Sequence, residues 1–172
     1  LAANNRALED NSVHTVVLTE LGDNRAVEFI GGSGSDRVVV DNASANQFTK
    51  LDGGSNVGTA ATGAANFNDS LTVVNTAVLD ANDVANIKGF ELLNLVENTL
   101  GNSTFDVTLS EAFVLANTTA TVPLTIASIT GTYGQRLGAG DTVRLEVSDL
   151  IANNAVKASV AARTINVQDL VN

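Results

Sequence analysis

The sequence predicts an all-β protein whose centre is a short right-handed parallel β-roll, or β-solenoid, with further β-strands flanking it at both ends. Three observations predict this class. The 172 residues are 44% hydrophobic but only 4% aromatic, with a single proline, a composition typical of short strands joined by polar turns. Several segments alternate apolar and polar residues with the period of a strand. A glycine-rich nonapeptide, GGSGSDRVV, connects two of these segments.

The predicted strands are short, rich in β-branched residues and separated by clusters of turn-forming residues. Phe105 to Leu109 alternates polar and apolar residues as a half-buried strand does. In chain order the predicted strands are Val13 to Glu20, Ala26 to Ile30, Arg37 to Asp41, Gln47 to Leu51, Leu71 to Asn75, Leu92 to Val96, Thr104 to Leu109, Val122 to Ile129, Thr142 to Val147 and Thr164 to Val167. Helical periodicity is weak, and only short connecting helices are predicted, at Ala81 to Ile87, Ser110 to Ala116 and Ser148 to Asn153.

A chain of 172 residues is long enough for one domain with a core or for two small ones, and we expect one continuous module. We expect it to consist of an N-terminal β segment at residues 1–25, β-roll-like coils at 26–100 and a β-rich continuation at 101–172. Methionine is absent even from position 1, which indicates a piece of a longer polypeptide or a processed product. The absence of cysteine excludes disulfides, thiolate metal sites and cysteine nucleophiles.

The expectation of calcium comes from the nonapeptide Gly31 to Val39, which follows the pattern G-G-x-G-x-D-x-U-x, where U is apolar. Its glycines permit a tight turn with carbonyl oxygens pointing inward, and Asp36 adds a carboxylate. Calcium takes about six to eight oxygen ligands, so one such turn supplies about half of a site. A stacked neighbouring turn must supply the other half.

A second turn of this kind appears when an insertion is allowed. Leu51 to Ser55 begins as the nonapeptide does and Asn68 to Val73 completes it, while Asn56 to Phe67 has the composition of a loop. If this loop bulges outward, Asp36 and Asp69 take equivalent positions in two stacked turns. The sequence therefore predicts about two strands for each coil.

Two further glycine turns are weaker copies of the motif. Ile87 to Glu91 precedes the apolar segment Leu92 to Val96 but lacks the glycine-aspartate set, and Lys88 places a positive charge where calcium would otherwise lie. Gly138 to Val143 is one residue shorter than the motif. We interpret it chiefly as an ordinary hairpin or coil turn.

Residues 26–96 resemble the repeats of hemolysin-type (RTX) calcium-binding proteins, most closely those of bacterial surface-layer proteins and type I secreted adhesins. The nonapeptide, Leu-Asp-Gly-Gly at 51–54, Asp-x-Leu-x-Val at 69–73 and Gly-Phe-Glu-x-Leu-Asn-Leu at 89–95 carry this resemblance. It implies Ca²⁺ as the cofactor, with one ion or at most two. The metal ligands that it implies are the carboxylates of Asp36 and Asp69, the turn carbonyls of Gly32, Gly34 and Gly54, and Asp52 as an additional ligand.

The resemblance also implies a function: a structural module of a secreted protein at the bacterial cell surface, a surface-layer subunit or an adhesin, whose folding and assembly calcium stabilises. Its partners would be calcium ions and other subunits or neighbouring domains. The alternatives are an RTX secretion module of an exported toxin or hydrolase, and a metal-free β-sandwich. A carbohydrate- or ice-binding solenoid would require a regular threonine or aromatic ladder, which is not present in the sequence.

Charge and residue content argue against other classes. The formal net charge is −10, and residues 20–111 hold thirteen acidic and four basic residues, which disfavours nucleic acid as a partner. No apolar run approaches the roughly 18 residues of a membrane span. The one histidine, His14, is predicted to be an exposed strand residue without a catalytic motif. Carboxylate pairs such as Asp80 with Asp83 could in principle perform acid-base chemistry, but their spacing is common in acidic chains, and we predict that the protein is not an enzyme.

Overall fold

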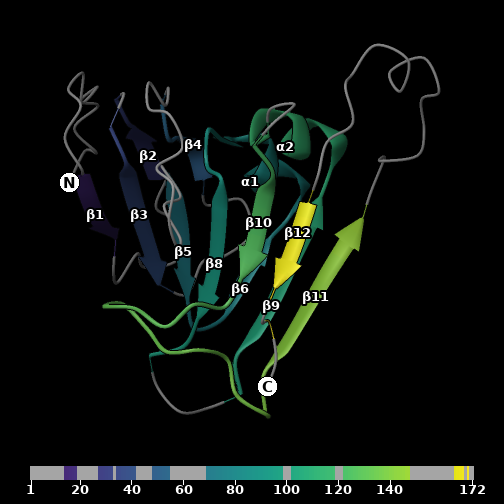
Figure 1. Cartoon of the computed structure of the whole chain (residues 1–172). Coiled ribbons are helices and arrows are strands. Elements are labelled where there is room, and N and C mark those ends of the chain that lie inside the picture. The colour runs from purple at the N-terminus through teal and green to yellow at the C-terminus, as the bar shows by residue number, and fades with distance from the viewer. Residues whose placement is uncertain are drawn as a thin grey trace.

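The computed structural model describes residues 14–18, 27–32, 34–41, 48–54, 69–98, 102–118, 122–147, 165–168 and 170. These residues form many short strands and two short helices (Figure 1), which confirms the predicted all-β class. The predicted loop at Asn56 to Phe67 and the predicted helix at Ser148 to Asn153 lie outside the described residues. Neither helix in the described ranges has the length and apolar character that crossing a membrane requires.

The strands pair in parallel in three sheets, one of six strands and two of three. The order of the six-stranded sheet is β1 (His14–Leu18), β3 (Asp36–Asp41), β5 (Ser70–Val74), β8 (Leu92–Val96), β10 (Leu124–Ala127) and β12 (Ile165–Gln168). One three-stranded sheet has the order β2 (Val27–Ile30), β4 (Phe48–Asp52), β7 (Ile87–Lys88), and the other has the order β11 (Thr142–Val147), β9 (Thr104–Leu109), β6 (Ala77–Leu79).

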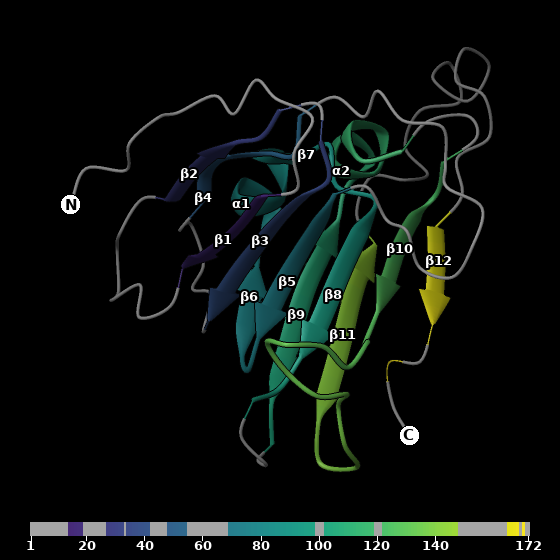
Figure 2. The ribbon, with the colours of Figure 1, turned by 60° about the vertical axis from the view of Figure 1, so that its left-hand side comes forward.

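The strands of the six-stranded sheet lie side by side in chain order. Between one strand of this sheet and the next, the chain passes through at least one of the three-stranded sheets. We call each such passage a circuit. The first two circuits pass through β2 and β4, the third through β6, α1 (Ala81–Ala85) and β7, the fourth through β9 and α2 (Glu111–Ala116), and the last through β11. Figure 2 shows the six-stranded sheet facing the other strands, with both helices near the end where its strands begin. Residues at the same position of successive circuits therefore form columns.

One apolar core fills the space between the sheets. Val38, Leu71, Leu93 and Ile126 are in register across four strands of the six-stranded sheet, and each is at least 98% buried. Phe48 and Phe105 reach the same core from the two three-stranded sheets. Removing such a side chain from water stabilises the fold by about 1.5 to 3 kcal/mol.

A second, smaller apolar layer covers the outer face of the six-stranded sheet. Val39, Val74 and Val96 point away from the main core, yet all three are buried, and Tyr133 packs against them. The segment at 131–135 joins this sheet through an isolated antiparallel bridge between Glu97 and Gln135. This layer explains why β5 and β8 are buried on both faces.

Two of the three predicted helices lie in the described residues and are confirmed there, and each begins with a side-chain cap. Asp80 accepts hydrogen bonds from the N–H groups of Asn82 at 2.8 Å and Asp83 at 3.1 Å, and the Ser110 hydroxyl accepts one from Phe113 N–H at 3.2 Å. These caps satisfy backbone donors that a helix leaves unpaired in its first turn. Asp80 and Asp83, a possible acid-base pair by spacing, here form a capping box.

The amide of Asn117 joins α2 to the preceding circuit. It donates to the carbonyls of Ile87 at 2.9 Å and Phe113 at 2.8 Å and accepts from the N–H of Phe90 at 3.0 Å. Because the side chain is 96% buried, Asn117→Ala removes hydrogen bonds that water cannot replace. We expect the free energy of unfolding, measured by chemical denaturation, to fall by about 2 to 3 kcal/mol. An equal loss for Asn98→Ala, at an exposed position, would contradict this role.

Candidate metal centre

The glycines that end the strands of the β2–β4–β7 sheet stack on one another. Gly31 N–H donates to Asp52 O at 2.7 Å, and Gly53 N–H donates to Lys88 O at 2.9 Å. A Cβ at Gly53 would collide with the Gly89 carbonyl and lie 3.1 Å from the Cβ of Asp69. Glycine at this corner therefore lets successive turns approach closely enough to stack.

Acidic residues form a column beside these turns, at the end of the six-stranded sheet where its strands begin. We define the acidic column as Asp36, Asp69 and Glu91, one residue from each of three adjacent circuits. Asp36 N–H donates to Asp69 Oδ1 at 2.6 Å, and Asp69 N–H donates to Glu91 Oε2 at 2.8 Å. Asp36 and Asp69 are fully buried, with 0% exposure. The carboxylates of Asp69 and Glu91 thus each bind the backbone of the preceding circuit.

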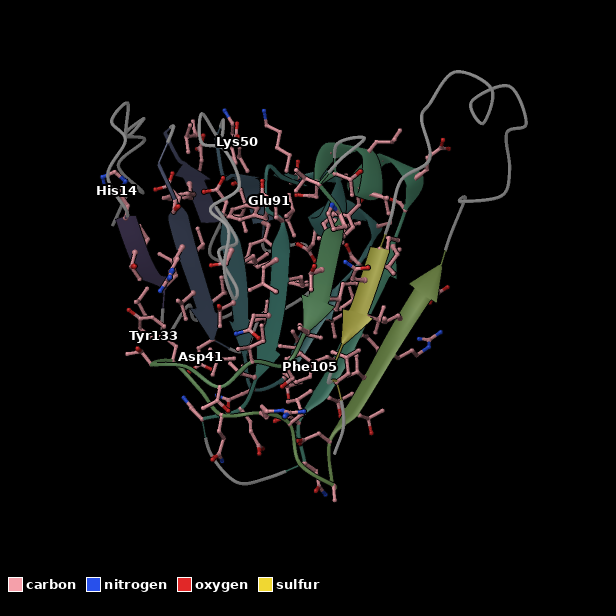
Figure 3. All side chains as sticks on the ribbon, viewed as in Figure 1. His14, Asp41, Lys50, Glu91, Phe105 and Tyr133 are labelled. Carbon is pink, nitrogen blue, oxygen red and sulfur yellow. The ribbon has the colours of Figure 1, made fainter. Side chains whose placement is uncertain are left out.

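Asp36 also connects its own turn to the edge strand β1. Its Oδ2 accepts a hydrogen bond from Gly32 N–H at 2.9 Å, and its Oδ1 lies 2.9 Å from Nδ1 of His14. The His14 side chain is 22% exposed. His14 lies in a strand, as predicted, but the prediction that it is exposed was wrong, because its ring is partly buried against Asp36. Figure 3 places His14 and Glu91 at the same end of the sheet.

Asp52 and Gly54 form a separate part of the predicted ligand set. Asp52 Oδ1 accepts a hydrogen bond from Gly54 N–H at 3.1 Å, and its Oδ2 lies 2.8 Å from Lys88 Nζ. The lysine predicted to oppose a cation is thus ion-paired with Asp52. Gly54 has φ +96°, and a Cβ there would collide with the carbonyl of Gly32, so two of the three predicted carbonyl ligands lie in stacked turns.

The structure therefore brings most of the predicted ligands together. Asp36 contacts Asp69 and Gly32 directly, and Gly32 stacks on Gly54. Gly34 is buried, and no hydrogen bond links it to the column among the described residues. Glu91 belongs to the same column but was not predicted as a ligand, although it precedes β8 as Asp69 precedes β5.

The geometry of the acidic column limits what it can bind. Neighbouring strands lie about 4.8 Å apart, whereas calcium binds oxygen at about 2.3 to 2.6 Å. One ion can therefore bridge two adjacent carboxylates of the column but not three. The part of the chain that the structure describes contains no group of three His, Cys, Asp or Glu side chains that could hold one metal ion.

Coordination and hydrogen bonding are compatible at Asp36 and Asp69. A carboxylate oxygen has two lone pairs, so an oxygen that accepts one N–H can still ligate a cation. Turn carbonyls and water would complete a shell of oxygen ligands, which hard cations prefer.

None of the protein-family models, curated proteins or solved structures with which the chain was compared matches it.

Proposed function

We propose that the chain is a calcium-binding structural module of a secreted bacterial surface protein, a surface-layer subunit or an adhesin. The observation that carries the proposal is the pair of fully buried carboxylates Asp36 and Asp69, which belong to adjacent circuits and are joined through the 2.6 Å bond from Asp36 N–H to Asp69 Oδ1. In this proposal one Ca²⁺ binds between them, with turn carbonyls of Gly32, Gly34 and Gly54 as further ligands.

The proposed fold is a short right-handed parallel β-roll with flanking strands. The strict chain order of the six-stranded sheet and the return through a second sheet in every circuit support it. The β-sandwich alternative consists of antiparallel sheets, whereas every strand pair in the described residues is parallel. Parallel stacking also explains why equivalent acids of different turns lie next to one another.

Calcium would act by linking binding to folding. Two carboxylates about one strand spacing apart repel each other, and burial raises the cost of their charges. A divalent cation between them removes this repulsion only in the folded state, so its binding free energy adds to stability. Low calcium inside the cell would leave the chain loose for export, and higher calcium outside would fold it. Other subunits or neighbouring domains would then assemble with the folded module.

Thermal unfolding with calcium and with a chelator tests the proposal. We expect calcium to stabilise the wild type by about 2.7 kcal/mol when its free concentration is 100 times the dissociation constant. Asp36→Asn/Asp69→Asn keeps the oxygen acceptors but removes both charges, so calcium should raise its melting temperature much less. Asp36→Ala/Asp69→Ala should behave in the same way with a lower starting stability.

Asp106→Asn is the matched control, because Asp106 is 40% exposed and lies 3.5 Å from Arg144 rather than in the column. This variant should respond to calcium as the wild type does. Equal melting temperatures with calcium and with chelator in the wild type would refute the metal proposal. If Asp36→Asn/Asp69→Asn responds to calcium as strongly as the wild type, calcium binds at a site that does not include these two carboxylates.

A further inference from the structure

A buried carboxylate lies at the opposite end of the six-stranded sheet, directly after β8. Glu97 is 3% exposed, and its Oε2 is buried and has no hydrogen-bond partner. Its backbone N–H donates to Gln135 O at 3.1 Å, and its carbonyl accepts the N–H of Gln135 at 2.7 Å. No cationic side chain among the described residues forms an ion pair with it. An ionised carboxylate that is buried without a counter-charge costs several kcal/mol. We therefore expect a partner for Glu97 that the described residues do not supply.

A second carboxylate faces the same place from the turn at Gly138. Asp141 is 91% buried; its Oδ1 accepts the N–H of Ser103 at 2.7 Å and its Oδ2 accepts the N–H of Gly138. A Cβ built on Gly138 would lie 3.7 Å from Glu97 Oε1 and 3.8 Å from Asp141 Oδ2. Residue 138 has no side chain, so the position beside one oxygen of each carboxylate is left unfilled.

We infer that Glu97, Asp141 and the Gly138 turn form a second site for a divalent cation, of which Ca²⁺ is the best match. Two carboxylates balance its charge, and carbonyls and water supply the remaining oxygens. Calcium–oxygen distances of about 2.3 to 2.6 Å require the Glu97 carboxylate to turn toward Asp141. Its Oε2 makes no hydrogen bond that would oppose this movement.

This site does not depend on the proposed calcium site at the acidic column. Asp36 begins β3 and Asp41 ends it, a separation of about 16 Å at about 3.3 Å per residue. Asp41, Glu97 and Tyr133 line one cavity of about 510 Å³ at this end, and Figure 3 shows Asp41 and Tyr133 far from Glu91. A cation here would fasten the 131–135 segment to the end of β8, because Gln135 pairs with Glu97.

The single tyrosine of this tryptophan-free chain provides a local sensor. Terbium(III) replaces calcium at oxygen-ligand sites and luminesces when a nearby excited tyrosine transfers energy to it. Because Tyr133 and Glu97 line the same cavity, terbium bound to the full chain should give tyrosine-sensitised emission, and added calcium should displace it. Wild-type protein without sensitised emission would overturn the inference.

Two variants test the ligands in different ways. Glu97→Gln removes one charge, and we expect the apparent terbium dissociation constant to rise more than about tenfold, since even partners behind the ligands contribute about 10- to 100-fold. Gly138→Ala keeps both carboxylates but fills the position beside them with a methyl group at ordinary contact distance. It should fold as the wild type, by circular dichroism, and lose affinity to a similar extent.

Gly131→Ala is the matched control, because a Cβ at Gly131 would meet no heavy atom within 4 Å. Its terbium affinity should equal that of the wild type. Unchanged affinity in Glu97→Gln, or in a folded Gly138→Ala, would overturn the inference. The acidic column can pass or fail its own calcium test without affecting this result, because the emission reports only the environment of Tyr133.

Discussion

Gly54→Ala is expected to lower the free energy of unfolding by about 4 kcal/mol, enough to unfold much of a marginally stable domain. Gly54 has φ +96°, a conformation that L side chains rarely adopt. The added Cβ would also collide with the carbonyl of Gly32 in the neighbouring turn. Backbone strain and overpacking each cost about 1 to 3 kcal/mol. Neither can relax easily, because Gly31 N–H is bonded to Asp52 O.

Urea or guanidinium denaturation followed by circular dichroism would measure this loss. Gly131→Ala again serves as the control, since its Cβ points into open space, and its stability should change little. A Gly54→Ala protein as stable as Gly131→Ala would show that the turns do not stack as the structure has them.

Phe105→Ala should destabilise the protein by about 3 to 5 kcal/mol. Phe105 is 0% exposed and lies in β9 between Ala77 and Val143 of the adjacent strands. Truncation removes a ring from the main core, and the small Ala77 beside it cannot fill the space. Phe105→Leu retains most of the volume and should lose clearly less. Equal losses for the two variants, measured by denaturation, would contradict the packing described for this sheet.

The positions of the strands could be predicted well, because β-branched runs and alternation are local properties of the chain. Thr104 to Leu109 and Thr142 to Val147 are strands over the predicted residues. β6 and β7 were missed because they are very short, at three and two residues. The predicted strand Val122 to Ile129 is shorter in the structure, at Leu124–Ala127. The alternation indicates which side chains face a core but not which strand lies beside which.

Burial on both faces could not be predicted for β5 and β8. The outer layer that covers them comes from Tyr133 and its neighbours, far along the chain and without a regular pattern. That Asp36 and Asp69 occupy equivalent positions in adjacent turns could be predicted, because the same turn motif occurs twice in the sequence. The approach of Glu97 to Asp141 depends instead on how two distant circuits stack. No local pattern encodes such a contact.

The central claim is that calcium binds between the turns of Asp36 and Asp69 and thereby stabilises the fold. The most direct test measures the free energy of unfolding against free calcium in the Glu97→Gln background, at calcium concentrations below those at which the weakened second site binds. Above the dissociation constant, one ion should add about 1.4 kcal/mol for each tenfold rise in calcium. Adding Asp36→Asn/Asp69→Asn should abolish the slope. If the free energy of unfolding of Glu97→Gln alone does not change with calcium, the claim is contradicted.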